Sequence, residues 1–188
     1  MPFLKNLFLL SSFLFLIFVL SGCASLSKEE CLQGNWFDIG YSDGKSGQRI
    51  TQLSEHREAC AEFHVSPDAT AYKQGREQGL ERYCTIENAL QEGLSGHDYH
   101  GVCPGELESV FIKKYKQGLS IYTLQKEIDS HKSRISSINY NLDSDKRRAK
   151  LSAKEIKKLE RELIELEVKI EEKQKRLYYM KGQADIAM

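Results

Sequence analysis

Residues 35–47 have the sequence NWFDIGYSDGKSG, which combines the aromatic residues of a packed helix with glycines that oppose helix formation. Each of Gly40, Gly44 and Gly47 would cost about 1 kcal/mol relative to alanine inside a helix. At about 100° per residue these glycines share one helix face with Trp36. Because a small-residue face beside a ring lets another helix approach closely, we expect the glycines to be packing notches.

Similar glycine segments return further along the chain. YKQG, LQEG and YKQG end at Gly75, Gly93 and Gly118, at unequal intervals that exclude a solenoid of fixed period. Rings and further glycines share two of these faces, namely Tyr72, Gly79 and Tyr83 with Gly75, and Tyr115 and Tyr122 with Gly118. We expect one kind of helix surface to be used several times. The alternative is that this aromatic-glycine face admits a ligand backbone or a glycan.

Helix start signals favour a mainly α-helical fold. Ser66, Pro67 and Asp68 form a typical helix start. Pro104 stands near another start, with acidic residues directly after it. Residues 93–103, GLSGHDYHGVC, have no helical continuation and are typical of a loop. No strong run of alternating apolar residues indicates a strand.

Four cysteines between residues 31 and 103 predict two disulfides. They are Cys31, Cys60, Cys84 and Cys103. An even number of cysteines in an oxidising compartment leaves three possible pairings. If the segments before and after residue 48 form antiparallel helices, Cys31 and Cys60 lie at the same end. This argument favours Cys31–Cys60 together with Cys84–Cys103, although the sequence alone does not decide.

After Gly118 the composition changes to lysine, glutamate, leucine and isoleucine. Apolar residues recur at alternating spacings of three and four over residues 121–142 and again over 156–180. The polar stretch between these runs contains Ser152 and Glu155, which form a capping box and predict a new helix start. Each run spans about three heptads, as in a coiled coil.

Two runs of similar length joined by a polar break favour an antiparallel coiled-coil hairpin. We expect it over residues 119–182, after a small disulfide-stapled helical domain at 31–118 and before a tail at 183–188. The alternative is one uninterrupted helix that dimerises, because the break spans two whole heptads and keeps the seam in phase.

Two polar residues interrupt the expected seam, His131 and Lys173. If Leu142 faces Ile156, these two residues would not meet across the hairpin. We expect Lys173 to extend outward along its alkyl chain. We expect His131 to stay neutral, as a tolerated imperfection rather than a pH switch.

The N-terminus is typical of an exported lipoprotein. Lys5 precedes an apolar run at residues 7–20, which has the length of a signal-peptide core and is short for a membrane-spanning helix. LSGC at residues 20–23 resembles the lipobox of bacterial lipoproteins. The resemblance implies a signal peptide at 1–22 and attachment of acyl chains such as palmitate to Cys23. The alternative is an uncleaved membrane anchor.

Ala24 follows the expected lipidated cysteine. In typical Gram-negative lipoproteins an aspartate there favours inner-membrane retention, so alanine implies the outer membrane by analogy. Residues 23–30 would be the lipidated cysteine and a short linker, which keeps the folded part near the bilayer. The 166 residues after cleavage hold 26 basic and 27 acidic side chains, a balance that does not favour nucleic acid as a partner.

Motifs for catalysis, nucleotides or metals are missing from the sequence. Residues 40–46, GYSDGKS, have one residue too few between the glycines for a Walker loop, and there is no G-x-S-x-G or H-E-x-x-H. A zinc site would need cysteines with nearby histidines, but no CxxC is present. His56, beside Arg57 and Glu58, is typical of a solvated helix face. The alternative is that His56 caps a helix or bonds a buried carbonyl. We expect no enzyme activity, cofactor or metal.

Longer strings of residues resemble a known family. CLQGNWFDIGYSDGKSG, HREAC, YKQGREQGLERYC, YHGVCPGEL and FIKKYKQG resemble a proteobacterial lipoprotein family catalogued as domain of unknown function 2799, over residues 31–118. The family has no assigned activity, so no catalytic role carries over. Trp36, Asp43 and His56 match its pattern. They form a candidate functional surface with Tyr41, Tyr72 and Tyr83.

Two classes of function are compatible with these observations. The first is a scaffold or adaptor, anchored to the outer membrane on its periplasmic side, whose coiled coil binds an envelope protein or a second copy of the chain. The second is a module that binds or hydrolyses an envelope ligand such as peptidoglycan, using the aromatic-glycine face of residues 35–118. Exposed rings beside a pocket would favour the second class, and buried rings the first.

Overall fold

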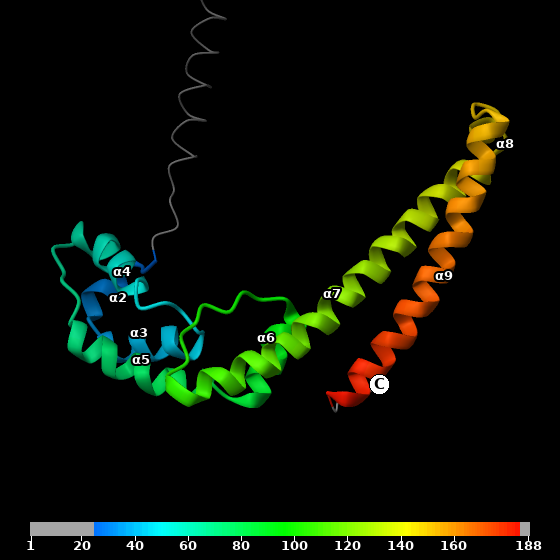
Figure 1. The fold of residues 1–188 in the computed structure, drawn as a ribbon. Coiled ribbons are helices and arrows are strands. Elements are labelled where there is room, and N and C mark those ends of the chain that lie inside the picture. The colour runs from blue at the N-terminus through cyan, green and yellow to red at the C-terminus, as the bar shows by residue number, and fades with distance from the viewer. Residues whose placement is uncertain (1–24, 185–188) are drawn as a thin grey trace, which may run out of the picture. The chain divides into compact units, whose positions relative to one another are not determined.

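The computed structural model describes residues 25–184, and all regular secondary structure in that range is α-helical, which confirms the predicted mainly α class. The expected signal peptide, the lipidated Cys23 and residues 185–188 lie outside the described range. No helix within 25–184 is both long and apolar enough to cross a membrane. The chain divides between Tyr83 and Cys84 into two units, which are described separately (Figure 1).

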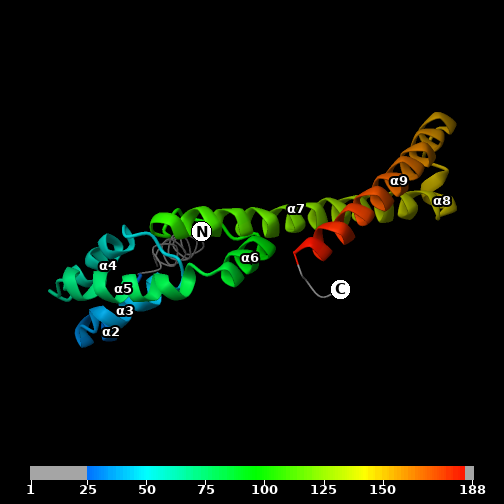
Figure 2. The same ribbon diagram turned by 60° about the horizontal axis from the view of Figure 1, so that its bottom comes forward.

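The described part of the first unit, residues 25–83, contains four helices, α2 (Lys28–Gln33), α3 (Trp36–Lys45), α4 (Gln52–Ala61) and α5 (Ala69–Tyr83). α3 and α5 lie side by side and form its main contact (Figures 1 and 2). The helix start predicted with Ser66 as N-cap lies two residues later: α5 begins at Ala69, and the Asp68 carboxylate, not Ser66, accepts hydrogen bonds from the backbone N–H groups of Thr70 and Ala71. This carboxylate thus satisfies two donors that the helix itself cannot pair.

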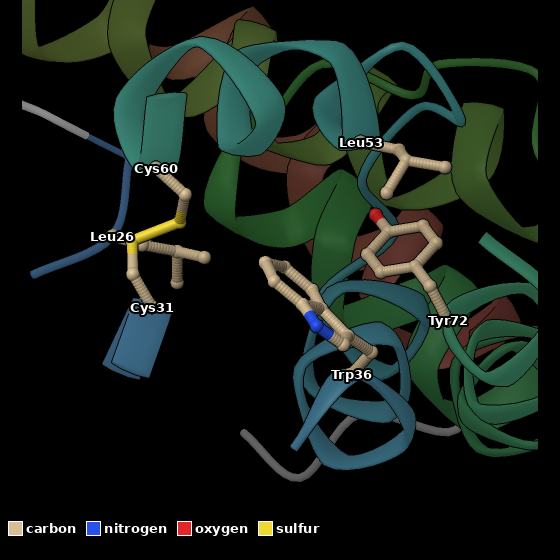
Figure 3. Packing of buried hydrophobic residues seen from close by; sticks show 6 residues of the cluster. All are labelled: Leu26, Cys31, Trp36, Leu53, Cys60 and Tyr72. Carbon is tan, nitrogen blue, oxygen red and sulfur yellow. A yellow bond between two sulfur atoms is a disulfide. The ribbon is translucent and has the colours of Figure 1, made fainter. Parts of the chain in front are cut away.

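The core of the first unit gathers around a disulfide (Figure 3). Cys31 and Cys60 are bonded, with their Cα atoms 5.4 Å apart, which is the pairing that the sequence favoured. The buried side chains around the disulfide are Leu26, Trp36, Leu53 and Tyr72. Leu26 belongs to the stretch expected to be a linker, so the chain is already packed on the domain there.

The second unit contains α6 (Ile86–Ser95), α7 (Gly105–Leu142), the short α8 (Asp145–Arg148) and α9 (Ala153–Gln183). α6 packs on α7, and α9 returns along α7 after the turn at α8 (Figures 1 and 2). This turn confirms the hairpin over the single uninterrupted helix. The second disulfide joins Cys84 to Cys103, with a Cα–Cα distance of 5.6 Å, and completes the favoured pairing.

The boundary that composition indicated at Gly118 is not a break in the structure. α7 runs through Gly118 without interruption, and its first part belongs to the same unit as the hairpin. The predicted helix start at Ser152 is confirmed as a reciprocal capping box with Glu155. Composition changed at Gly118 because α7 exchanges α6 for α9 as its neighbour, while the helix itself continues.

The hairpin is closed by an apolar seam and by ion pairs across it. The buried side chains on its two arms are Ile121, Leu124, Ile128, Ile138, Leu166 and Leu177. Arg134 pairs with Glu162 through two hydrogen bonds of 2.7 and 3.0 Å. Lys173 extends from the seam to the exposed Glu127 carboxylate, as expected. The pairs Arg134–Glu162 and Glu127–Lys173 agree with the register that aligns Leu142 with Ile156, and His131 and Lys173 line one hollow on the hairpin.

Candidate functional site

The glycines of α3 bring its backbone into contact with that of α5. A Cβ atom built on Gly40 would lie 2.0 Å from the carbonyl oxygen of Tyr72, and one on Gly44 would lie 2.2 Å from that of Arg76. The reciprocal distances are 1.9 Å from Gly75 to the Phe37 oxygen and 2.2 Å from Gly79 to the Tyr41 oxygen. Only glycine permits such an approach, so the packing-notch prediction is confirmed.

Gly47 has a different role from the one expected. It lies beyond the end of α3 and adopts φ +67°, a left-handed conformation that favours glycine. An added Cβ would lie 2.4 Å from the ring of Tyr83. Gly47 therefore forms a turn under a buried ring instead of lying on the helix face with Gly40 and Gly44.

The second unit repeats this arrangement between α6 and α7. A Cβ on Gly93 would lie 2.1 Å from the Tyr115 oxygen, and one on Gly118 would lie 2.4 Å from the Leu90 oxygen. Gly96, with φ +70°, lies under the ring of Tyr122 as Gly47 lies under Tyr83. The sequence carries the same order, with DGKSG and EGLSG on the first helices and QGLERY and QGLSIY on the second. The two helix pairs are thus built on one pattern.

Most rings of the candidate functional surface are part of the core. Trp36, Tyr72 and Tyr83 have exposed fractions of 5, 0 and 4 %, and Tyr41 is half-buried. Trp36, Tyr72 and Tyr83 are enclosed by the first unit, while Tyr41 keeps part of its surface exposed. The three buried rings are therefore not available as an exposed ligand face.

Three residues of the candidate surface do meet in one hydrogen-bond network. The Tyr72 hydroxyl donates to Asp43 Oδ2 over 2.5 Å, and His56 Nε2 lies 2.8 Å from the same oxygen. His56 Nδ1 lies 2.9 Å from the hydroxyl of Ser25. The prediction of a solvated helix face at His56 was wrong, because His56 is only 2 % exposed. It lies on the buried side of α4 with Leu53 and Cys60.

Both ring nitrogens of His56 have a hydrogen-bond partner. Nε2–H donates to the Asp43 carboxylate, and Nδ1 pairs with the Ser25 hydroxyl, which can donate or accept. Burial, followed by the hydrogen bond to Asp43, raises the pKa of Tyr72 well above its usual value, while the nearby Arg76 opposes this. Tyr72 therefore stays protonated and keeps donating to Asp43.

A serine, a histidine and an aspartate in hydrogen-bond contact could in principle activate the serine as a nucleophile. Here the imidazole is enclosed, and its aspartate also holds Tyr72. Three hollows on the described surface are lined by residues of α7 and α9. None of these three is lined by Ser25, Asp43, His56 or Tyr72. Within residues 25–184 no cluster of three or more His, Cys, Asp or Glu side chains is arranged to hold a metal ion. The geometry fits a structural tether better than a catalytic centre.

The tether reaches a residue that sequence reasoning missed. Ser25 stands two residues after Cys23 and carries no local motif, so the nearest signal was the apolar Leu26 that follows it. Leu26 is buried against the disulfide, and Ser27 begins α2 through a capping box with Glu30. The chain is therefore fixed to the domain from Ser25 onward by a hydrogen bond, a buried side chain and a helix cap.

Comparison with known proteins gives one match. Residues 35–120 match the family model described as "Protein of unknown function (DUF2799)". No curated protein and no solved structure matches the chain. The matched range begins at Asn35, the N-cap of α3, and spans both glycine-packed helix pairs. Residues 35–120 of this chain therefore form a domain of the DUF2799 family.

Proposed function

We propose that this protein is a lipid-anchored scaffold of the bacterial cell envelope, without enzyme activity, that presents its helical hairpin to an envelope protein. The lipobox at residues 20–23 supports a lipid on Cys23, and Ala24 favours the outer membrane and its periplasmic face by analogy. The disulfides Cys31–Cys60 and Cys84–Cys103 fit an oxidising compartment.

The proposal rests on the contrast between the buried aromatic rings of the first unit and the exposed apolar side chains of the hairpin. The rings of Trp36, Tyr72 and Tyr83 are buried in the packing of the first unit, so these three are not available to a ligand. The hairpin exposes large apolar side chains on both arms, namely Tyr140 on α7 and Ile164, Val168, Tyr178 and Tyr179 on α9. Exposed apolar side chains that lie together are typical of a protein–protein contact surface.

The tether supports the same function. A chain that passes from an acylated Cys23 directly into the docked Ser25 and Leu26 would hold the first unit close to the bilayer. A scaffold benefits from such a mount, since the hairpin then stays within reach of the membrane along the connecting chain.

A shortened hairpin tests the proposal without exposing the glycine-packed core. Deleting residues 128–141 from α7 and 157–170 from α9 removes two heptads from each arm. The α8 turn, the seam phase and the contact of Tyr122 with Gly96 all remain. Crosslinking in intact envelopes, followed by pull-down, then compares this variant with the full chain, both lipidated.

We expect the specific crosslinked proteins of the full chain to disappear with the shortened hairpin, while both variants stay in the outer-membrane fraction. If the same proteins or glycans are recovered from both, the working surface lies in residues 35–120 and the scaffold proposal fails. The substitution Cys23→Ser tests the anchoring part of the proposal separately. That part fails if the chain is absent from the membrane fraction both with and without this substitution.

A further inference from the structure

α9 carries a second stripe of side chains on the side away from the hairpin seam. Ile164, Val168 and Tyr178 are 61 to 64 % exposed, whereas the seam residues Leu166 and Leu177 are buried. At about 100° per residue the exposed stripe is centred opposite the seam. We define the outer face of α9 by Ile164, Val168, Glu171, Lys175, Tyr178 and Gly182, which follow one another at spacings of four and three. This spacing is the heptad pattern of a helix contact.

The charges on the outer face are complementary to those on the outer face of a second α9 that runs antiparallel to it. Glu171 and Lys175 stand at its centre, 2.7 Å apart within the helix. If two copies of α9 align antiparallel, Glu171 of each copy faces Lys175 of the other. Parallel alignment would place each of these residues against its own copy, where like charges repel.

The apolar ends of the outer face are complementary in the same register. Antiparallel alignment brings Val168 opposite Tyr178 and Ile164 opposite Gly182. A Cβ on Gly182 would meet nothing within 4 Å, so the space over this glycine is open to the side chain of Ile164. At both ends of the contact the large side chain of Ile164 thus faces the small Gly182. Between the ends, the ring of Tyr178 faces the branched side chain of Val168.

We propose that the outer face of α9 binds the outer face of a second copy of this chain, in antiparallel orientation, with Glu171 of one copy paired to Lys175 of the other. Such a contact is isologous and closes as a two-fold dimer. This inference does not require the proposed scaffold function. Each copy of a scaffold built this way would keep the exposed rings of Tyr140 and Tyr179, which lie off the outer face, for an envelope protein.

Charge reversal tests the pairing directly. In Glu171→Lys both copies carry lysine at 171 and 175, and in Lys175→Glu both carry glutamate, so each variant repels itself. An equimolar mixture of the two restores both cross pairs while leaving the pair within each helix broken. Sedimentation of the full chain in density-matched detergent should show a dimer for the unchanged chain, at least tenfold weaker dimerisation for each variant, and recovery in the mixture.

Orientation has its own test, because the antiparallel register brings residue 168 to residue 178. Val168→Cys and Tyr178→Cys should each form few disulfides between copies, and a mixture of the two should form many. Circular dichroism of every variant checks that helix content is unchanged, as expected for exposed positions. A monomeric unchanged chain, single charge variants that dimerise like it, or self-linking of Val168→Cys alone would overturn the proposal.

The dimer test also separates this inference from the scaffold proposal. Glu171→Lys leaves the hairpin at full length, so it should lose the second copy and keep the crosslinked envelope proteins. The shortened hairpin lacks Ile164 and Val168 and should lose both. Loss of the envelope proteins in Glu171→Lys would mean that dimerisation is required for capturing them, whereas a monomeric unchanged chain would contradict the dimer alone.

Discussion

The α3–α5 and α6–α7 pairs use one packing pattern with different contents. In both pairs, glycines lie against carbonyl oxygens of the opposite helix, and a glycine with positive φ lies under a tyrosine ring. The first pair has four glycines against carbonyls, while the second has two, because Ala89 and Lys114 stand where the repeat would place Gly40 and Gly75. The contact thus tolerates the loss of outlying glycines but keeps the pair nearest the tyrosine.

The two helix pairs differ more in their polar side chains than in their number of glycines. By the same alignment, Phe111 takes the place of Tyr72 and Glu92 takes the place of Asp43. Phe111 has no hydroxyl to donate, and Glu92 pairs with the exposed His97 over 3.5 Å. Only the first pair therefore has the buried network that reaches Ser25. The comparison indicates that the glycines build the helix pair and that the network is an addition for holding the chain after Cys23.

The largest effect should come from adding a methyl group at a backbone contact. Gly75→Ala would place Cβ 1.9 Å from the Phe37 oxygen, so α3 and α5 must separate. We expect a loss of more than about 3 kcal/mol in the free energy of unfolding. Trp36 is the single tryptophan and lies in the first unit, so its fluorescence in a urea titration follows this unit alone.

Gly182→Ala is the matched control, since its added Cβ meets nothing within 4 Å. This change should leave the Trp36 transition where it is and stabilise α9 by at most about 1 kcal/mol. Similar unfolding midpoints for Gly75→Ala and the unchanged chain would contradict the proposed backbone contact.

Removing the disulfides should affect the two units separately and by similar amounts. The bonds close loops of 29 and 19 residues, and loop-closure entropy makes each worth about 3 kcal/mol. Replacing Cys31 and Cys60 by alanine should shift the Trp36 transition. Replacing Cys84 and Cys103 should shift helix loss measured by circular dichroism and leave Trp36 unaffected. A shift of Trp36 by the second replacement would show that the units unfold together.

Asp43 should matter more than its counterpart in the repeat. Asp43→Ala leaves the hydroxyl of Tyr72 and Nε2 of His56 buried without their acceptor, at a cost of about 2 kcal/mol. Glu92→Ala removes an ion pair to an exposed histidine and should cost less than about 1 kcal/mol. Limited proteolysis near Ser25 should also become faster in Asp43→Ala. Equal effects of the two substitutions on unfolding would argue against a special role for the network.

Much of this fold could be predicted from the sequence because its signals are local. Helix starts at Asp68 and Ser152, the heptads of the hairpin and the glycine faces each depend on residues within a few turns of one another. The sequence even carried the repeated glycine segments. It did not show which glycine face would meet which, since several similar faces could pair.

The network was out of reach for a different reason. Ser25, Asp43 and His56 come from three separate parts of the chain, and their contacts depend on how α2, α3 and α4 pack. His56 stands between residues that are exposed on the same helix, so its neighbours suggested solvent. Its spacing of three from Leu53 and four from Cys60 was the signal for the buried side, because both of those residues are in the core.

The smallest effect is the titration of Tyr72. An unfolded tyrosine loses its proton near pH 10, whereas burial and the bond to Asp43 raise the pKa of Tyr72 in the folded chain. Its contribution to stability is therefore complete below about pH 10 and is lost as pH rises toward the folded pKa, because the unfolded chain then gains by ionising. Tyr72→Phe removes this titration and makes the first unit resemble the second, where Phe111 stands.

At pH 8 Tyr72→Phe should be about 1 kcal/mol less stable than the unchanged chain, since Asp43 loses a donor. Between pH 9 and 11 the gap should narrow, as only the unchanged chain loses the contribution of Tyr72. Burial also raises the pKa of Tyr99, which belongs to the second unit. Urea titrations followed by the fluorescence of Trp36 report the unfolding of the first unit, so the titration of Tyr99 does not contribute to the measured difference. Tyr179→Phe, on an exposed ring outside the outer face of α9, is the control and should parallel the unchanged chain. If the difference in stability between Tyr72→Phe and the unchanged chain stays constant up to pH 11, Tyr72 ionises equally in the folded and unfolded chains. This result would contradict the raised pKa of Tyr72 in the buried network.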